Sequence, residues 1–542
     1  MQTSSRVTFG LCLLLILISL CTLFFRLGSL PFLGSDEPRY ARIAEEMSRQ
    51  GRWVTPMLEG RPWLEKPPLY YWVTIPFYKL LGVSETSARL GPALLSLMAS
   101  FFILWIGARL WNIRAGFFAA AVFLTSVGAA AFGRSGSTDM PLAACLTAGL
   151  AILGVALFEN LAAWKVWGAY VFLGLSILGK GPVALLIWAG VGLSFWLLDE
   201  RGELVRRWRI PAGLLIITAV SFPWFWLAFR ENGFAFIAIF IVNHNIARYI
   251  TDIHHHTQPV YYFLPILPGL LFPWTAWLLF AWPRPLLATL RNWREWDRRY
   301  LFLACWALFP LLFFSFSRSK LPGYILPCIA PLALILGARI FESLDPGAAD
   351  ARRAASSLLK CVAWVHLALA AALAIAFPAV FLQSYGGTWA PALLISAVCL
   401  APALLTLHCA RRGRLHGAFT VTVLQGVMVI LALAQFAFPA IGRQQSARDI
   451  SRQALALREK AETIVTYNYF HHALNYYTGY SVSDDLPDPV ALGRYASTHP
   501  RFLVVTEASH LAEIEHLKSA GRSVALLGEQ GKLRLLRVLG PN

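Results

Sequence analysis

Long apolar runs separated by short polar connections dominate the first 440 residues of the chain. A helix needs about 20 predominantly apolar residues to cross roughly 30 Å of hydrocarbon. Runs that approach or reach that length lie near residues 7–26, 86–110, 113–131, 139–160, 164–179, 181–198, 209–230, 261–281, 298–316, 322–341, 355–382, 389–409 and 415–440. The pattern therefore predicts a polytopic α-helical membrane protein with about 13 transmembrane helices.

The first long connection, residues 27–85, carries a helical pattern of its own. Ser35 is suited to cap a helix that starts near Pro38, because serine is favoured at the N-cap and proline in the first turn. An apolar face and a charged face then follow at helical spacing, the first made of Tyr40, Ile43, Ala44 and Met47 and the second of Arg39, Arg42, Glu46 and Arg49. Such helices lie in the membrane interface, and a second one is expected after PWLEKPPLYYW.

The last hundred residues change character. From residue 442 the apolar runs shorten to strand length, as in TIVTY, RFLVV, SVALL and KLRLLRVL, and alternate with helix-like stretches at 446–460 and 508–519. This alternation predicts a small soluble α/β domain over 442–542, attached to a transmembrane domain over 1–441. The chain shows no internal repeat, so the inverted-repeat signature of many transporters is missing.

Composition excludes a large soluble protein. Of the 542 residues, 57% are hydrophobic and 14% are charged, whereas soluble proteins carry about 25% charged residues. The net charge of +18 would suggest nucleic-acid binding in a soluble protein. In a membrane protein it is better explained by basic cytoplasmic loops that also meet anionic lipid, so no nucleic-acid partner is predicted.

Basic residues also predict the orientation. With the N-terminus in the cytoplasm, the cytoplasmic loops contain Arg201, Arg206, Arg207 and Arg209, then Arg291, Arg294, Arg298 and Arg299, then Arg352 and Arg353, and finally Arg411, Arg412 and Arg414. The connections 27–85 and 231–260 and everything after residue 441 then lie on the opposite side, which in a bacterial cell is the periplasm.

Acidic residues stand next to apolar runs at two places on that outer side. Asp36 and Glu37 precede the amphipathic helix, and Asp139 follows GRSGST at the outer end of a span. Ionisable groups at such depths are costly and are often functional, so these three are candidate catalytic residues. The alternative interpretation is that acids at a helix N-terminus only complement the helix dipole.

Several outer basic residues could bind a phosphate. Lys66 follows Glu65 and precedes two prolines that hold the pair on an extended segment. A single lysine at a helix end is more often a snorkelling side chain than a ligand-binding residue. Together they suggest a phosphate-bearing ligand held by Lys66, Arg39, Lys180, Arg248, Lys320 and Tyr324.

Histidines gather in the connection 231–260. His244 and the run His254, His255 and His256 lie near Asp252. Histidine with a carboxylate is a plausible zinc-ligand set, which Glu65 could complete from the first connection. The spacing matches no standard zinc motif, and an exposed, hydrogen-bonded histidine cluster explains it equally well.

Four segments carry a resemblance to a known family. DEPRYARIAEEM, EKPPLYYW, GKGP and SKLPGYILP resemble the aminoarabinose transferases of lipid A modification. Those enzymes belong to the membrane glycosyltransferases with the GT-C fold, which include the protein O-mannosyltransferases. The resemblance runs from residue 8 to about residue 440 with the order of the loops intact.

The resemblance implies an inverting glycosyltransferase of the bacterial inner membrane that acts as a monomer, with its active site on the periplasmic face. The implied donor is undecaprenyl phosphate carrying 4-amino-4-deoxy-L-arabinose, the acceptor is a lipid A phosphate, and no nucleotide takes part. By analogy Asp36 is the leading catalytic residue, and Asp139 supports the site. Structural zinc would be held by Glu65, His244 and His256, although the histidine run offers several registers.

Two other functions stay open at this point. The same fold could transfer a sugar from a polyprenyl phosphate to another acceptor, such as a protein Ser/Thr hydroxyl. A lipid transporter or flippase is a different class, which predicts charged residues in the middle of several spans and internal symmetry. The charged residues of this chain gather instead at the outer ends of spans, which disfavours transport.

Overall fold

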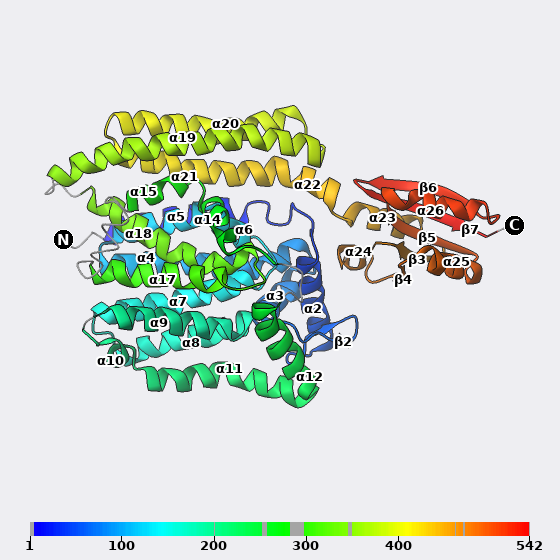
Figure 1. The fold of residues 1–542 in the computed structure, drawn as a ribbon, viewed down its shortest axis with the longest axis horizontal. Coiled ribbons are helices and arrows are strands. Elements are labelled where there is room, and N and C mark those ends of the chain that lie inside the picture. The colour runs from blue at the N-terminus through cyan, green and yellow to red at the C-terminus, as the bar shows by residue number, and fades with distance from the viewer. Residues whose placement is uncertain are drawn as a thin grey trace.

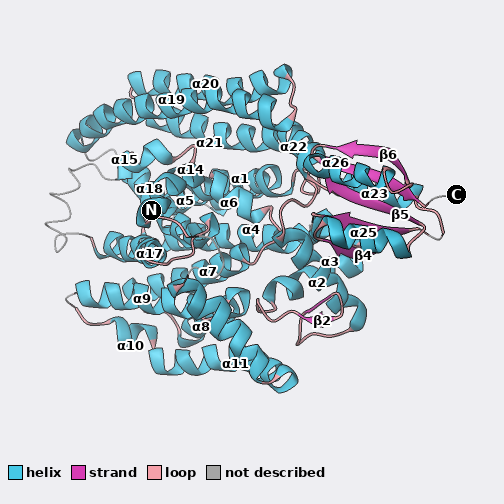
Figure 2. Ribbon diagram, turned by 45° about the vertical axis from the view of Figure 1, so that its right-hand side comes forward, coloured by secondary structure: helices cyan, strands magenta, loops and turns pink. Residues whose placement is uncertain are grey.

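The chain folds into a long helical body with a small sheet domain at one end (Figure 1). The computed structural model describes residues 5–199, 201–251, 257–281, 297–344, 349–460, 462–469 and 472–540. The N-terminus lies at the end of the body opposite the sheet. Figure 2 shows the same division, with helices throughout the body and the long strands confined to the C-terminal domain.

Among the described residues, 9 helices are long and apolar enough to cross a membrane. They are Arg6–Phe24 (α1 and η1), Glu85–Leu110 (α4), Asp139–Phe158 (α7), Ile210–Asn232 (α11), Arg298–Ser315 (α17), Pro322–Glu342 (η6 and α18), Ser356–Tyr385 (in α19), Trp389–Arg411 (α20) and Leu415–Gln445 (α21, η7 and α22). A bent pair, α5 (Ile113–Thr125) and α6 (Val127–Gly133), turns by 65° and forms a tenth candidate. The predicted polytopic helical fold is confirmed.

The remaining predicted spans are also helical, but they are shorter or more polar. The range 164–179 corresponds to α8 (Ala163–Lys180), which carries a lysine near each end, and 181–198 to α9 (Val183–Leu198). The range 261–281 is broken into short pieces, namely η3 (Val260–Tyr262), α14 (Phe263–Leu271), η4 (Thr275–Trp277) and α15 (Leu278–Ala281). Pro273 explains the break after α14, because proline removes a backbone donor and clashes with the preceding turn, whereas Pro265 and Pro268 lie within α14.

Small residues let the central helices pack closely. A Cβ added at Gly107 of α4 would lie 2.4 Å from the Cα of Gly116 in α5, and one at Gly337 of α18 would lie 2.5 Å from the backbone nitrogen of Ala119 in α5. Lipid tails give no hydrophobic drive for helix association, so close backbone approach and its dispersion contacts hold such helices together.

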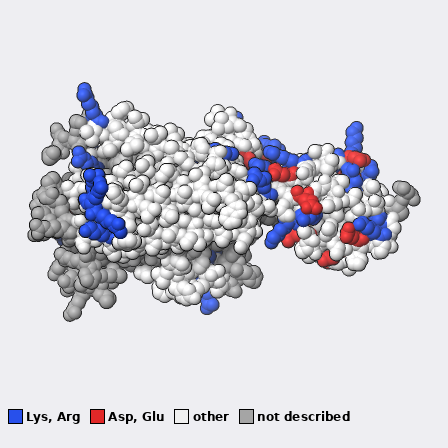
Figure 3. All heavy atoms as spheres, turned by 90° about the horizontal axis from the view of Figure 1, so that it is seen from above, with Lys and Arg blue, Asp and Glu red and all other residues white. Residues whose placement is uncertain are grey.

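The two ends of the body differ in charge and in content. The short helix α10 (Leu204–Trp208) and the α20–α21 connection lie at the end that also holds the N-terminus, and the sheet domain lies at the other (Figure 1). On the face drawn in Figure 3, lysines and arginines gather at the N-terminal end, while the middle of the body is almost free of charge. Such a charge-free band is expected of a surface that meets hydrocarbon.

Two helices outside the spans cover the end of the body next to the sheet domain. They are α2 (Asp36–Gln50) and α3 (Leu69–Leu81), joined by a hairpin of β1 (Met57–Leu58) and β2 (Arg61–Pro62). The predicted apolar face of α2 is buried. The prediction for the charged face is wrong in part, because Glu46 is 5% exposed and accepts hydrogen bonds from the backbone of Glu59 and Gly60. Ser35 occupies the N-cap position, but its side chain makes no capping hydrogen bond.

The C-terminal domain is a five-stranded mixed sheet with strand order β4-β3-β5-β7-β6. The strands are β3 (Thr463–Tyr467), β4 (Val482–Leu486), β5 (Arg501–Glu507), β6 (Ser523–Gln530) and β7 (Leu533–Leu539), with helices α23 (Arg448–Leu457), α24 (His472–Tyr477), α25 (Pro489–Thr498) and α26 (Leu511–Glu515). Strand β3 pairs in parallel with β4 and with the central strand β5, and β7 pairs antiparallel with β5 and β6. Separate apolar clusters cover the two faces of the sheet.

Candidate active site

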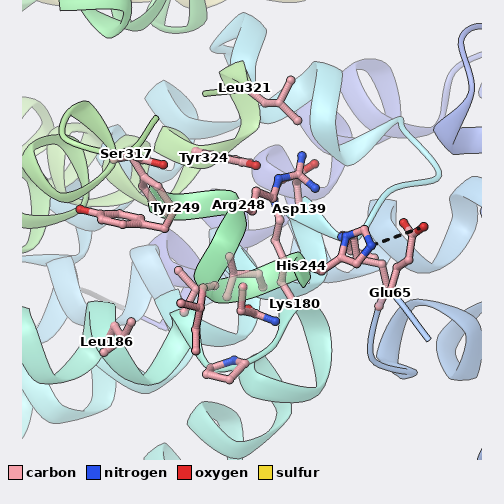
Figure 4. A pocket seen from close by; sticks show the side chains of 18 of the residues that line it. Glu65, Asp139, Lys180, Leu186, His244, Arg248, Tyr249, Ser317, Leu321 and Tyr324 are labelled. Atoms are coloured by element: carbon pink, nitrogen blue, oxygen red, sulfur yellow. Dashed lines mark hydrogen bonds and ion pairs between the residues drawn. The ribbon is translucent and has the colours of Figure 1, made fainter. Parts of the chain in front are cut away.

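One cavity of about 980 Å³ brings together side chains from distant parts of the chain. Its wall includes the start of α2, the segment around Lys66, the facing ends of α7 and α8, the segment 241–250 and the loop before α18 (Figure 4). Nine of the residues predicted from the sequence line it: Asp36, Arg39, Glu65, Lys66, Asp139, Lys180, His244, Arg248 and Tyr324. They come from several connections on one side of the body, so residues that are far apart in the sequence lie close together in the fold.

Two of the acids in the cavity already have cationic partners. The Asp36 carboxylate accepts a hydrogen bond of 2.5 Å from Arg39, one helical turn further along α2. Asp139, the first residue of α7, forms an ion pair with Lys180 at the end of α8. The Lys180 ammonium group also lies 4.7 Å from the ring centre of Tyr324. These two pairs neutralise their own charges within the cavity.

Two other cations line the cavity, Lys66 and Arg248. Within the part of the chain that the structure describes, neither the Lys66 ammonium group nor the Arg248 guanidinium group makes an ion pair. Burial lowers the pKa of Lys66 to about 8, Arg248 contributes to the same shift, and the neighbouring Glu65 opposes it. The guanidinium of Arg248 lies 5.8 Å from the ring centre of Tyr324. Partly buried cations without an ion-pair partner among the described residues favour an anionic ligand.

Glu65 and His244 are close enough to act together. Their Oε1 and Nε2 atoms are 3.5 Å apart (Figure 4). Burial raises the pKa of Glu65, whereas Lys66 and Arg39 oppose that rise. No group of three or more histidine, cysteine or acidic side chains arranged for a metal occurs among the described residues. The third predicted ligand, His256, lies outside the described residues, as do Asp252, His254 and His255.

The rest of the cavity wall is apolar. It includes Leu142, Val183, Leu186, Ile241, Ile246, Ile250, Phe313, Phe314 and Leu321. These hydrocarbon side chains lie next to the cations Lys66 and Arg248. The combination fits an amphipathic ligand, with an anionic group at one end and an apolar chain at the other.

Comparisons with known proteins agree with this chemistry. The sequence model of a family described as dolichyl-phosphate-mannose-protein mannosyltransferase matches residues 65–226. An undecaprenyl phosphate-alpha-4-amino-4-deoxy-L-arabinose arabinosyl transferase from Yersinia enterocolitica is 34% identical over 312 residues, which are 56% of this chain and 54% of that protein. A relative of the same kind from Pseudomonas fluorescens is 31% identical over 318 residues, 57% of this chain and 52% of that protein. The chain thus spans about half the length of these curated relatives.

Solved structures extend the similarity to the whole fold. The crystal structure of ArnT from Cupriavidus metallidurans bound to undecaprenyl phosphate superimposes with a TM-score of 0.79 at 23% identity, covering 97% of this chain and 98% of that one. The archaeal oligosaccharyltransferase AglB from Archaeoglobus fulgidus gives a TM-score of 0.52 at 12% identity, covering 94% and 70%. The chain therefore shares the fold of ArnT over almost its whole length, and it is similar in sequence to arabinosyl transferases over about half of its length. The match to AglB shows the same general fold.

The acid next to Asp36 contacts other segments of the protein. Glu37 does not line the cavity, and its two carboxylate oxygens accept hydrogen bonds of 3.0 and 2.8 Å from Arg89 of α4. It also accepts one from the backbone of Gly136, three residues before Asp139. Arg89 is 2% exposed and binds two further carbonyl oxygens, those of Leu27 and Leu30. The Glu37 carboxylate thus holds three segments together, and its predicted catalytic role stays a prediction.

Sequence analysis missed Arg89, although a signal existed. It is a charged residue within the apolar run 86–110, and charges within spans are costly unless they are paired. A search for charges inside apolar runs would have found it.

We expect Arg89→Ala to destabilise the protein by about 3–5 kcal/mol, because removing one partner of a buried ion pair leaves the other charge uncompensated. Thermal unfolding in detergent would measure the change. Arg109→Ala serves as the matched control, since Arg109 pairs with Glu159 at an exposed position and exposed pairs contribute only about 0–1 kcal/mol. Equal effects of the two substitutions would contradict the structural role of Arg89.

Lys320 is the other predicted residue that the cavity does not include. It is 3% exposed, and its ammonium group donates hydrogen bonds to the backbone carbonyls of Gln258, at 2.7 Å, and Ser317, at 2.5 Å. These carbonyls take two of its three donors, and its predicted substrate-binding role stays a prediction. Lys320 instead ties the segment after residue 257 to the loop that carries Tyr324.

Proposed function

We propose that this protein transfers 4-amino-4-deoxy-L-arabinose from undecaprenyl phosphate to a phosphate of lipid A. The observation that carries the proposal is the pair of cations Lys66 and Arg248, which make no ion pair among the described residues and lie beside apolar walls of one cavity. A polyprenyl phosphate has the matching chemistry, an anionic phosphate on a hydrocarbon chain. The names of the curated relatives supply the sugar.

The leaving group needs cations more than it needs an acid. The donor sugar is attached to a phosphodiester, which departs as an anion that Lys66 and Arg248 can stabilise where its charge develops. Tyr324, whose ring lies near Arg248 and Lys180, completes this side of the cavity. Transfer in a single displacement inverts the configuration of the sugar.

The acceptor needs little help from a base. A phosphate of lipid A is already ionised at neutral pH, since a phosphomonoester has its second pKa at about 6. Asp36 therefore positions the acceptor, or stabilises positive charge on the sugar ring or its amine. Its side chain is 55% exposed at the start of α2, so it can approach a bound ligand. Asp139 and its partner Lys180 support the opposite wall.

We further propose the bacterial inner membrane as the location, with the sheet domain and the cavity on the periplasmic side. The support is the positive-inside rule applied to the basic connections at the N-terminal end of the body. Lipid A and the sugar-loaded carrier would both reach the cavity from the outer leaflet. We expect the protein to act as a monomer.

Zinc is proposed as a structural ion. Glu65 and His244 fit two of its ligands, being a carboxylate and an imidazole whose nearest atoms are 3.5 Å apart, and His256 is the proposed third. We expect purified protein to contain about one zinc per chain, and Glu65→Gln or His244→Ala to contain less, as measured by mass spectrometry of the metal content. Glu159→Gln is the matched control. Wild-type protein without zinc above background would contradict the proposal.

A protein hydroxyl is the second candidate acceptor, favoured by the match of residues 65–226 to a protein mannosyltransferase family. A hydroxyl must lose a proton during transfer, so Asp36 would then act as a general base and kcat would decrease at acidic pH. With a phosphate acceptor, this decrease of kcat at acidic pH is not expected.

Mass spectrometry of lipid A tests the proposed function. The chain is expressed in a bacterium that lacks its own aminoarabinose transferase, with Asp36→Ala as the inactive control. Lipid A carrying the mass of aminoarabinose only in cells with the wild-type chain is the expected result. Unmodified lipid A despite good expression would overturn the assignment of acceptor and sugar, while leaving the fold unaffected.

A further inference from the structure

The connection between η1 (Leu20–Phe24) and α2 is held in place by the C-terminal part of the chain. The backbone nitrogen of Phe32 donates a hydrogen bond of 2.8 Å to the hydroxyl of Tyr477, at the end of α24. The carbonyl of Phe32 accepts one of 3.4 Å from the side chain of Ser446. Both backbone groups of a residue four positions before Asp36 are thus bound by side chains more than 400 positions away.

The Tyr477 hydroxyl has a second bond that fixes its position. It donates at 2.8 Å to Glu85, the first residue of α4. Arg448 of α23 approaches the same carboxylate at 3.5 Å. A single hydroxyl therefore bridges the connection before α2 and the start of a long transmembrane helix, with one donor and one acceptor role, which is all that a tyrosine hydroxyl offers.

Aromatic packing reinforces this contact. Phe32 is fully buried, with the Tyr476 ring edge-on at 5.0 Å and the Tyr477 ring stacked at 6.2 Å. The guanidinium of Arg42, on the charged face of α2, lies 4.0 Å from the ring centre of Tyr480. We call Tyr476, Tyr477 and Tyr480 the tyrosine latch. It covers the face of α2 that the sequence pattern predicts to be exposed.

Asp36 depends on this arrangement for its own position. Its carboxylate is half-exposed and pairs with Arg39 of the same helix, so the pair moves wherever α2 moves. The apolar face of α2 packs on α3, and the ion pair of Glu37 with Arg89 and the tyrosine latch add directional contacts that set its position. A shift of about 1 Å in a reacting group is enough to lower a rate severely.

We propose that the C-terminal sheet domain positions the catalytic helix through the tyrosine latch, which makes Tyr477 a positioning residue for Asp36. This inference rests on the proposed function for the catalytic role of Asp36. The latch acts through α2 and contacts no ligand, so it controls the chemical step while the binding of the lipid carrier is left to Lys66 and Arg248.

Tyr477→Phe tests the latch, because it keeps the ring and removes both hydrogen bonds. We expect amide hydrogen exchange in α2 to become about fivefold faster or more, the factor for one lost hydrogen bond. We expect kcat to fall about tenfold or more, as for a misplaced catalytic group, with the KM for the donor lipid unchanged. Glu85→Ala breaks the same bridge from its other end and is expected to give the same two changes.

Two matched substitutions serve as controls. Tyr495→Phe also removes a hydroxyl that makes a hydrogen bond in the C-terminal domain, but its partner is Thr463 of β3. Tyr480→Phe keeps the ring over Arg42 and removes a buried hydroxyl that has no partner among the described residues. Both variants are expected to retain wild-type exchange in α2.

Each outcome decides the proposal. Wild-type exchange in α2 and wild-type kcat in both Tyr477→Phe and Glu85→Ala would overturn it. Faster exchange with unchanged kcat would also overturn it, since the contact would then be structural only. Exchange is measured without substrate, so a wrong assignment of the sugar or acceptor leaves the exchange result standing and shows itself as unmodified lipid A with the wild-type chain.

Discussion

Asp36→Asn is expected to lower kcat by on the order of 10²–10³, the loss seen when one group that stabilises transition-state charge is removed. The amide keeps the size of the carboxylate and can still accept a hydrogen bond from Arg39, so α2 should stay in place. What disappears is the negative charge that faces the sugar or the acceptor. Turnover of a synthetic polyprenyl-linked aminosugar by detergent-purified protein would measure the change.

The binding of polyprenyl phosphate is the internal control for Asp36→Asn. Its affinity should remain within about twofold of wild type, because Lys66 and Arg248 carry the phosphate. Asp484→Asn, the same substitution at an exposed position of β4, should leave both quantities unchanged. Near-normal turnover by Asp36→Asn would rule out the proposed role of the carboxylate.

Lys66→Ala is expected to act on binding rather than on the chemical step alone. A hydrogen bond to a charged group contributes about 1.5–3 kcal/mol, so Kd for polyprenyl phosphate should rise roughly ten- to 150-fold. Lys165→Ala provides the matched control, since Lys165 is an exposed lysine at the other end of α8. Calorimetry or tryptophan fluorescence with the lipid in detergent would give both constants. Unchanged affinity in Lys66→Ala would contradict the phosphate-binding role.

The pH dependence of the same affinity follows from the lowered pKa of Lys66. Burial and Arg248 disfavour the charged form of Lys66. Without a bound ligand, its ammonium group therefore loses its proton as the pH rises through about 8. An anion binds the charged form, and wild-type affinity should therefore fall above that pH and not below it. The phosphate itself stays fully ionised there, since its second pKa is about 6. Lys66→Ala should lack this alkaline decrease, and an identical decrease in the variant would exclude Lys66 as its source.

Local patterns were sufficient for most of the architecture. The apolar runs predicted the helical body, because backbone groups in hydrocarbon can be satisfied only within a helix or a closed barrel. The period of α2 predicted its buried face, and the short apolar runs TIVTY and RFLVV became the neighbouring strands β3 and β5. Proline in the range 261–281 was visible in the sequence, yet the break into four short helices was not anticipated.

The sequence predicted which residues line the cavity better than it predicted how they are arranged. Asp36, Lys66, Asp139 and Arg248 were chosen because charged residues are costly beside hydrocarbon, and all four line one cavity. Their roles as substrate ligands stay predictions. Lys320 satisfied the same argument, but its ammonium group is bound by backbone carbonyls, which no pattern of side chains reveals.

The sequence by itself determined the class of protein, its helices and strands, and which chemical groups it can bring to a ligand, since these depend on hydrophobicity and periodicity over a few neighbouring residues. Only the tertiary structure decided which of those groups act together. Asp36 and Glu37 are adjacent, but successive residues on a helix point about 100° apart, so one faces the cavity and the other faces Arg89. The way α2 docks makes that choice, and it depends on Tyr477, which lies 445 positions beyond Phe32.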